Sequence, residues 1–76
     1  MTQNEWKNIF ANNLFGILRE RGISQSQLSK DSGVSISRIS DYINERAVPS
    51  IFNAINIAYA LDMEVNELID FDERVY

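Results

Sequence analysis

Apolar residues recur at steps of three and four along most of this chain, and no stretch alternates strictly between apolar and polar positions. Such steps place side chains on one face of a helix. Gly22 follows the first series, at a position suited to the left-handed residue that ends many helices. The pattern predicts a first helix over about residues 4–21, whose inward residues would be Trp6, Phe10, Leu14, Ile17 and Leu18.

Two shorter helical patterns follow, joined by the turn Asp31-Ser32-Gly33-Val34. Ser24 has the chemistry of an N-cap, and Gln27 stands three residues later, at the spacing of a capping box. We therefore expect a helix over about residues 25–31 with Leu28 turned inward. Gly33 can adopt positive φ in the turn without steric penalty.

Ser35 can cap the next helix, which we expect over about residues 35–45. Ile39 and either Tyr42 or Ile43 would share its inner face, with the Tyr42 hydroxyl in contact with water. A tight pair of helices of this kind is the unit that presents one helix to the DNA major groove. This helix is therefore the candidate recognition helix.

The second half of the chain predicts two more helices. Pro49, the only proline, suits the entry to a fourth helix. A short fifth helix over about residues 65–70 would pack Val65, Leu68 and Ile69 back onto the others. The expected fold class is all-α, a compact bundle of five helices. The inward residues expected of the fourth helix are Ile51, Ala54, Ile55, Ala58 and Leu61.

Composition narrows the possible functions. The 76 residues, 45% of them hydrophobic, fit one domain spanning residues 1–76. The absence of Cys and His removes disulfides, thiolate or imidazole metal sites and the usual acid–base residue of neutral pH. The carboxylates have no nucleophile or phosphate loop beside them. We expect no enzymatic activity, no catalytic residue, no cofactor and no metal.

No apolar run approaches the ~20 residues of a membrane span, and the first residues lack the order of a secretory signal. We therefore expect a cytoplasmic protein with no membrane partner. The net charge of -4 is unfavourable for phosphate binding, but it is unevenly distributed. Residues 1–23 have a net charge of +1, residues 24–50 of 0 and residues 51–76 of -5. The acidic residues are concentrated at the C-terminal end, so residues 1–50 can still face DNA.

Several segments together resemble the lambda-repressor-like, or Cro/C1-type (XRE-like), helix-turn-helix regulators. The resemblance covers about residues 10–69 and leaves residues 70–76 as an acidic and aromatic tail. It implies a domain in which the second and third helices form the helix-turn-helix and bind double-stranded DNA. The segments, each at the family's spacing, are RGISQSQLS at 21–29, SGVSISRIS at 32–40, the Pro-Ser pair at 49 and 50, and IAYALDMEVNELI at 57–69.

The resemblance also implies roles for individual residues. Gln25, at the start of the second helix, would touch a DNA phosphate. The implied base-reading residues are Ser35, Ile36, Ser37 and Asp41, and further phosphate contacts would come from Arg38, Asn44 and Arg46. Alternatively, Ser35 only caps its helix, Asp41 is a surface charge, and Gln25 and the arginines are a solvated surface.

The chain departs from the family pattern at several positions. Many relatives have a partly buried ion pair between the first and third helices, where Leu18 and Ile43 stand here. We therefore predict an apolar contact between these two side chains. Glu45 and Asp62 replace glycines that commonly follow the third and fourth helices. Aspartate tolerates the left-handed conformation, and Asn44 is the alternative left-handed residue beside Glu45, which would move it away from phosphate.

Phe52 and Tyr59 stand seven residues apart, at positions of the fourth helix that are usually polar in the family. With Phe71, Val75 and Tyr76 they could form an isologous dimer face that places two recognition helices about one DNA turn apart. In the alternative, the C-terminal tail folds back over Phe52 and Tyr59 within one monomer.

The resemblance thus implies a sequence-specific DNA-binding transcriptional regulator, in particular a repressor that binds a palindromic operator as a homodimer. Phage repressors, restriction–modification controllers and antitoxins share this architecture. The alternative function is a protein-interaction module of the same fold, which binds a regulator or polymerase through the Phe52 and Tyr59 surface and the acidic tail. We expect no small-molecule effector, since little chain follows the fifth helix to form an effector domain.

Overall fold

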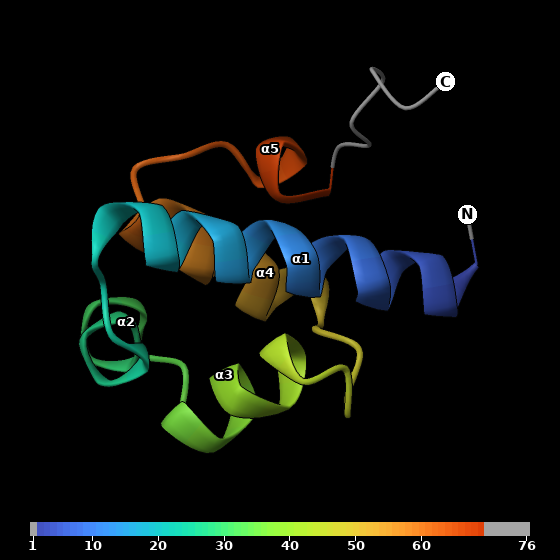
Figure 1. Ribbon diagram of the computed structural model, residues 1–76, viewed down its shortest axis with the longest axis horizontal. Helices are drawn as coiled ribbons and strands as arrows, with labels where there is room; N and C mark the ends of the chain where they lie inside the picture. Colours follow the sequence, from blue (N-terminus) through green and yellow to red (C-terminus); the bar gives the residue numbers. More distant parts are fainter. Residues whose placement is uncertain (1, 70–76) are drawn as a thin grey trace.

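The computed structural model describes residues 2–69, and within them it contains five helices and no strand. The all-α prediction is confirmed. Helix α1 crosses the middle of the domain, with α5 on one side and α2 and α3 on the other, while α4 lies behind it (Figure 1). The helices are α1 (Gln3–Arg21), α2 (Gln25–Ser32), α3 (Ile36–Ile43), α4 (Ile51–Ala60) and α5 (Val65–Ile69).

Side-chain caps fix where the first four helices begin. The hydroxyls of Ser24, Ser35 and Ser50 each accept a hydrogen bond from the backbone N–H three residues later. Thr2 and Glu5 form a complete capping box at α1, which the sequence analysis did not single out. The capping box expected at Ser24 is only half present, because the Gln27 side chain donates to Asp31 Oδ1 at 2.8 Å instead.

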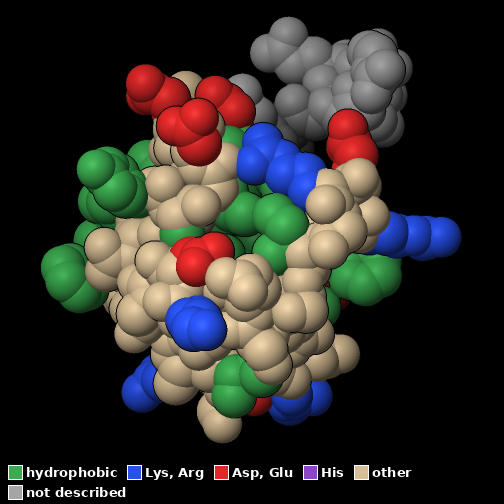
Figure 2. All heavy atoms as spheres, turned by 90° about the vertical axis from the view of Figure 1, so that its left-hand side faces the viewer, with side chains coloured by type: hydrophobic (Ala, Val, Ile, Leu, Met, Phe, Trp, Pro, Cys, Tyr) green, Lys and Arg blue, Asp and Glu red, His purple; other side chains and the backbone are tan. Residues whose placement is uncertain are grey.

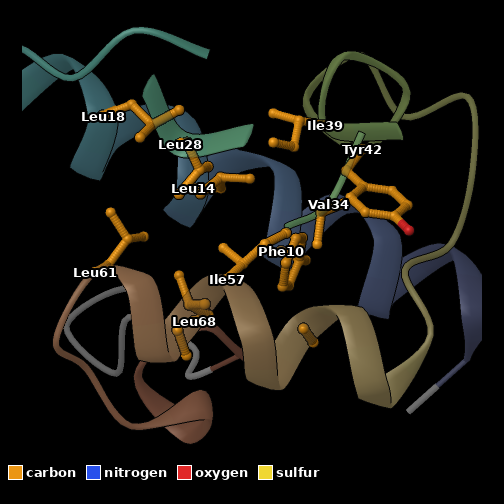
Figure 3. Close-up of a cluster of buried hydrophobic side chains, with 12 residues drawn as sticks. Phe10, Leu14, Leu18, Leu28, Val34, Ile39, Tyr42, Ile57, Leu61 and Leu68 are labelled. Carbon is orange, nitrogen blue, oxygen red and sulfur yellow. The ribbon is translucent and has the colours of Figure 1, made fainter. Parts of the chain in front are cut away.

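The core lies where α1 meets the other helices. The fully buried rings of Phe10 and Tyr42 meet edge to face, with ring centroids 6.0 Å apart (Figure 3). The expectation that the Tyr42 hydroxyl stays in water is wrong: Tyr42 is 1% exposed and its hydroxyl accepts a hydrogen bond from Asn53 Nδ2 at 2.8 Å. This bond links α3 to α4 and satisfies a polar group inside the core.

The predicted inner face of α4 is partly wrong. Ile51 and Ile55 were expected inside, but they are 62% and 47% exposed. Ile57, which was not among the expected core residues, is completely buried. Apolar residues occur on both sides of this helix, so periodicity alone does not identify the buried side. Packing against the rest of the core selects Ala54, Ile57, Ala58 and Leu61.

Leu18 and Ile43 lie in the same apolar environment. Leu18 is 5% exposed and belongs to the core, and the partly buried Ile43 packs against that core. Both side chains also line one surface hollow beside Phe15 and Ile23. The two positions are therefore on facing sides of α1 and α3, as the predicted apolar contact requires.

Two turns use left-handed residues that are not glycine. Glu45, after α3, has φ of 58°, and Asp62, after α4, has φ of 56°. Asn44, the alternative considered for the first turn, has φ of -94° and is not left-handed. The left-handed region is unfavourable for residues with a Cβ, by about 1–2 kcal/mol for most of them.

Replacing Glu45 with glycine is therefore expected to raise the free energy of unfolding by up to about 1 kcal/mol. The gain is smaller than the full strain, because glycine also increases the entropy of the unfolded chain. Chemical denaturation monitored by circular dichroism would measure it. Glu45→Gln is the matched control, since it removes the charge and keeps the strained backbone. Equal stabilisation by both variants would mean that the charge, not φ, is unfavourable.

Candidate nucleic-acid interface

The turn between α2 and α3 is held by hydrogen bonds from both sides. Ser29 Oγ donates to the Val34 carbonyl at 2.7 Å, and the Val34 N–H donates to Ser32 Oγ at 3.1 Å. Gly33, with φ of 76°, supplies the sharp change of direction. Leu28 and Ile39 are buried on either side of this turn. The angle between the two helices, and hence the outward face of α3, is fixed by the core.

One surface hollow of about 400 Å³ lies between the start of α2 and the outer face of α3. Gln25 lines the hollow from α2, and Arg46 lines it from the turn that follows α3. Hydroxyl, amide, carboxylate, guanidinium and methyl groups meet here, which are the groups that read base edges and phosphates. The residues of α3 that line the hollow are Ile36, Ser37, Ser40 and Asp41.

An ion pair stands at the centre of this surface. Arg46 Nε donates to Asp41 Oδ1 at 3.0 Å, and the Arg46 backbone N–H donates to the Asp41 carbonyl at 2.8 Å. The Arg46 guanidinium also donates to Ser40 Oγ at 3.1 Å. The Asp41 carboxylate thus has a neighbouring cation on the outer surface, and three hydrogen bonds connect Arg46 to Ser40 and Asp41.

Three of the predicted site residues lie outside this hollow. The Ser35 hydroxyl accepts from the Arg38 backbone N–H at 3.2 Å, which is the capping role considered as an alternative. The Arg38 side chain is exposed on the first turn of α3. Asn44 folds back, with Nδ2 donating to the Ser40 carbonyl at 2.9 Å. Ser35, Arg38 and Asn44 therefore flank the surface.

Sequence reasoning missed Ser40. Its hydroxyl accepts from Arg46 and lies 3.4 Å from Asn44 Nδ2, so it connects the end of α3 to the turn that follows. The signal was available, because Ser40 follows Ser37 by three residues and so shares its helix face.

The proposed dimer residues lie elsewhere, on α4. Phe52 and Tyr59 are 71% and 85% exposed, as expected from their positions. Phe71 and Tyr76, assigned to the same face from sequence, lie outside the described residues. The two described side chains give α4 an apolar outer surface, and apolar patches of this kind are typical of protein contacts.

Within residues 2–69, no group of acidic side chains is arranged to hold a metal ion. In the same part of the chain, no helix is long and apolar enough to cross a bilayer.

A short helix, a glycine turn and a second helix with a polar outer face define a helix-turn-helix protein. A family model described as helix-turn-helix matches residues 17–68, which is more than half of the chain. The chain belongs to this family, of the Cro/C1 type, and is a DNA-binding transcription regulator. Comparison with curated proteins and with solved structures gave no significant match.

Proposed function

We propose that this protein is a sequence-specific repressor that binds a palindromic operator as a homodimer. The observation that supports this most strongly is the shared surface of α2 and α3, where Gln25 lies beside the outward residues of α3. A repressor of this type needs no further domain, because occupying the operator excludes other proteins from it. The homodimer would place two copies of α3 in successive major grooves.

Each residue of this surface would make a DNA contact that suits its chemistry. Gln25 begins α2, where its amide and the helix N-terminus together favour a phosphate. Ile36, 46% exposed, can contact a thymine methyl, and the Ser37 hydroxyl can donate to or accept from a base edge. The Asp41 oxygen that Arg46 does not bind can accept from a cytosine amino group.

Phosphate contacts would surround this centre. Arg38 and Arg46 are exposed cations at the two ends of α3, and Asn44 and Ser35 lie beside them. The Ser35 hydroxyl can contact DNA while it caps the helix, because a hydroxyl has two acceptor lone pairs and one donor. These contacts would set the position of α3 in the groove without reading sequence.

Selection of the purified protein against randomised duplex DNA at low salt tests the proposal. We expect enrichment of an inverted repeat whose half-sites are about 10 base pairs apart. Ser37→Ala should then relax the preference at one position of each half-site, by about 0.5–1.5 kcal/mol, the net contribution of one neutral hydrogen bond. If the folded protein enriches no sequence, it is not a sequence-specific repressor, and the protein-interaction function is favoured.

The homodimer is tested separately by sedimentation. The wild-type chain is expected to dimerise at micromolar concentration, and a Phe52→Ser/Tyr59→Ser variant is expected to be monomeric and to keep its helical content. Both side chains are mostly exposed in the monomer, so their removal leaves no cavity. A wild-type chain that remains monomeric at high micromolar concentration would exclude this dimer.

A further inference from the structure

A second hollow, of about 550 Å³, lies away from the helix-turn-helix, between the outer face of α4 and α5. Ile55 and Tyr59 come from α4, and Met63 and Val65 come from the turn and the start of α5. Asp62, Glu64 and Glu67 also line it, together with Ala58. We call it the acidic hollow, since apolar side chains and three carboxylates line it together.

The apolar part of the acidic hollow is open to solvent. Tyr59 is 85% exposed and Ile55 is 47% exposed, so residues 2–69 leave Tyr59 almost uncovered and Ile55 about half covered. In Figure 2, hydrophobic side chains protrude at one edge of the domain, with a group of Asp and Glu side chains above them. Exposed apolar groups bordered by polar ones are typical of surfaces that bind another protein.

Within residues 2–69 the three carboxylates form no salt bridge, although the Arg21 guanidinium lies near Asp62, where it donates to the Leu61 carbonyl. Arg46 and Asp41 form the single salt bridge found in the described part of the chain, and it lies on the opposite recognition surface. No hydrogen bond to the side chains of Asp62, Glu64 or Glu67 is present within residues 2–69. Three like charges within six residues raise the local negative potential, which attracts a cationic group.

Two possible occupants of the acidic hollow are a second copy of the chain and the chain's own tail, and charge makes both unfavourable. In an isologous contact centred on the acidic hollow, a second copy would bring three further carboxylates against these three. The tail at residues 70–76 has three acidic residues and one arginine, so it is also negatively charged. Like charges held together at an interface are unfavourable, and neither occupant has a net positive charge.

We propose that the acidic hollow binds a cationic amphipathic segment of a partner protein, with apolar side chains on Ile55 and Tyr59 and with lysines or arginines on the carboxylates. Such segments dock as helices in apolar grooves of other proteins. Because Tyr59 also belongs to the proposed dimer face, the partner would compete with the second copy. This regulatory consequence rests on the proposed function, whereas the binding itself does not.

The test uses the full chain and a synthetic peptide of leucine, lysine and alanine with its leucines at helical spacing. During titration, the backbone amides of Ile55, Tyr59 and Glu64 are expected to shift in NMR spectra, and added salt should weaken the binding. A peptide with glutamate in place of every lysine should leave these amides unchanged. A lysine peptide that shifts none of them would overturn the proposal.

Paired variants separate the hollow's charges from the net charge. Glu64→Gln/Glu67→Gln is expected to weaken peptide binding about tenfold, as the loss of two exposed ion pairs predicts. Asp31→Asn/Glu45→Gln removes the same charge from residues that do not line the hollow, and should leave affinity unchanged. Equal weakening by both pairs would show attraction to net charge only, and would overturn the site.

The same spectra detect the other occupants. If the amides of Glu64 and Glu67, which lie outside the Phe52 and Tyr59 dimer face, shift as the free Phe52→Ser variant is concentrated, a second copy occupies the hollow itself. If Phe71→Ser shifts them without peptide, the chain's own tail occupies it. Either result overturns the proposal. Binding of the lysine peptide by a chain that enriches no DNA sequence would support the acidic hollow and reject only the repressor function.

Discussion

Replacing Ile57 with alanine is expected to lower the free energy of unfolding by about 2–5 kcal/mol. Ile57 is completely buried, so the truncation leaves a cavity in the core cluster that also contains Phe10 and Leu14. A domain of this size is expected to have a total stability of only about 4–11 kcal/mol. The variant should therefore be partly unfolded at elevated temperature, and urea denaturation monitored by circular dichroism would measure the loss.

Ile55→Ala is the matched control, because it makes the same chemical change two residues away on the same helix. Ile55 is 47% exposed, so its truncation is expected to lower stability by under about 1 kcal/mol. Periodicity alone assigned the opposite roles to these two isoleucines. If Ile55→Ala is the more destabilising variant, the buried face of α4 is not the one that contains Ile57.

Arg46→Ala is expected to weaken operator binding by about 10- to 100-fold, the loss typical of a hydrogen bond to a charged group. Two effects combine, because the variant loses a phosphate contact and leaves the Asp41 carboxylate without its cation beside the DNA. The slope of log affinity against log salt should become less steep, by about 0.9 for the lost phosphate contact. Titrations of the selected operator at several salt concentrations would measure both quantities.

A double-mutant cycle separates the two effects. Asp41→Asn/Arg46→Ala removes the unpaired carboxylate as well, and should bind more tightly than Arg46→Ala alone. The folded protein should be little affected, since both side chains are substantially exposed and such a pair contributes about 0–1 kcal/mol to stability. If the double variant binds no better than the single one, Asp41 lies too far from phosphate to repel it.

Local signals allowed most of the fold to be predicted from the sequence. Ser24, Ser35 and Ser50 cap helices whose first residues follow directly, and Gly22 and Gly33 end helices in the left-handed conformation. Capping and turn geometry depend on a few neighbouring residues, so the sequence contains them explicitly. For α1, α2, α3 and α5, the helices whose bounds were predicted, those bounds accordingly lie within about two residues of those observed.

The candidate site was predictable to the same extent. The family resemblance assigned Ile36, Ser37 and Asp41 to the exposed face of the recognition helix, and in the structure they line one hollow on the outer face of α3. The Asp41–Arg46 ion pair was not predicted, because Arg46 lies beyond the end of α3. Its approach depends on the left-handed Glu45, which turns the chain back so that Arg46 reaches Asp41.

The sequence by itself thus determined the five helices, the caps at Ser24, Ser35, Gly22 and Gly33, and the outward residues of the recognition helix, since each follows from spacing and chemistry within a few residues. The tertiary structure alone decided which side of α4 is buried, because that helix is apolar on both sides and only its partners distinguish Ile57 from Ile55. It also decided that Tyr42 bonds to Asn53 and that carboxylates gather around Tyr59. Such contacts join residues of different helices and turns. The fold brings these residues together, so no local sequence pattern predicts the contacts.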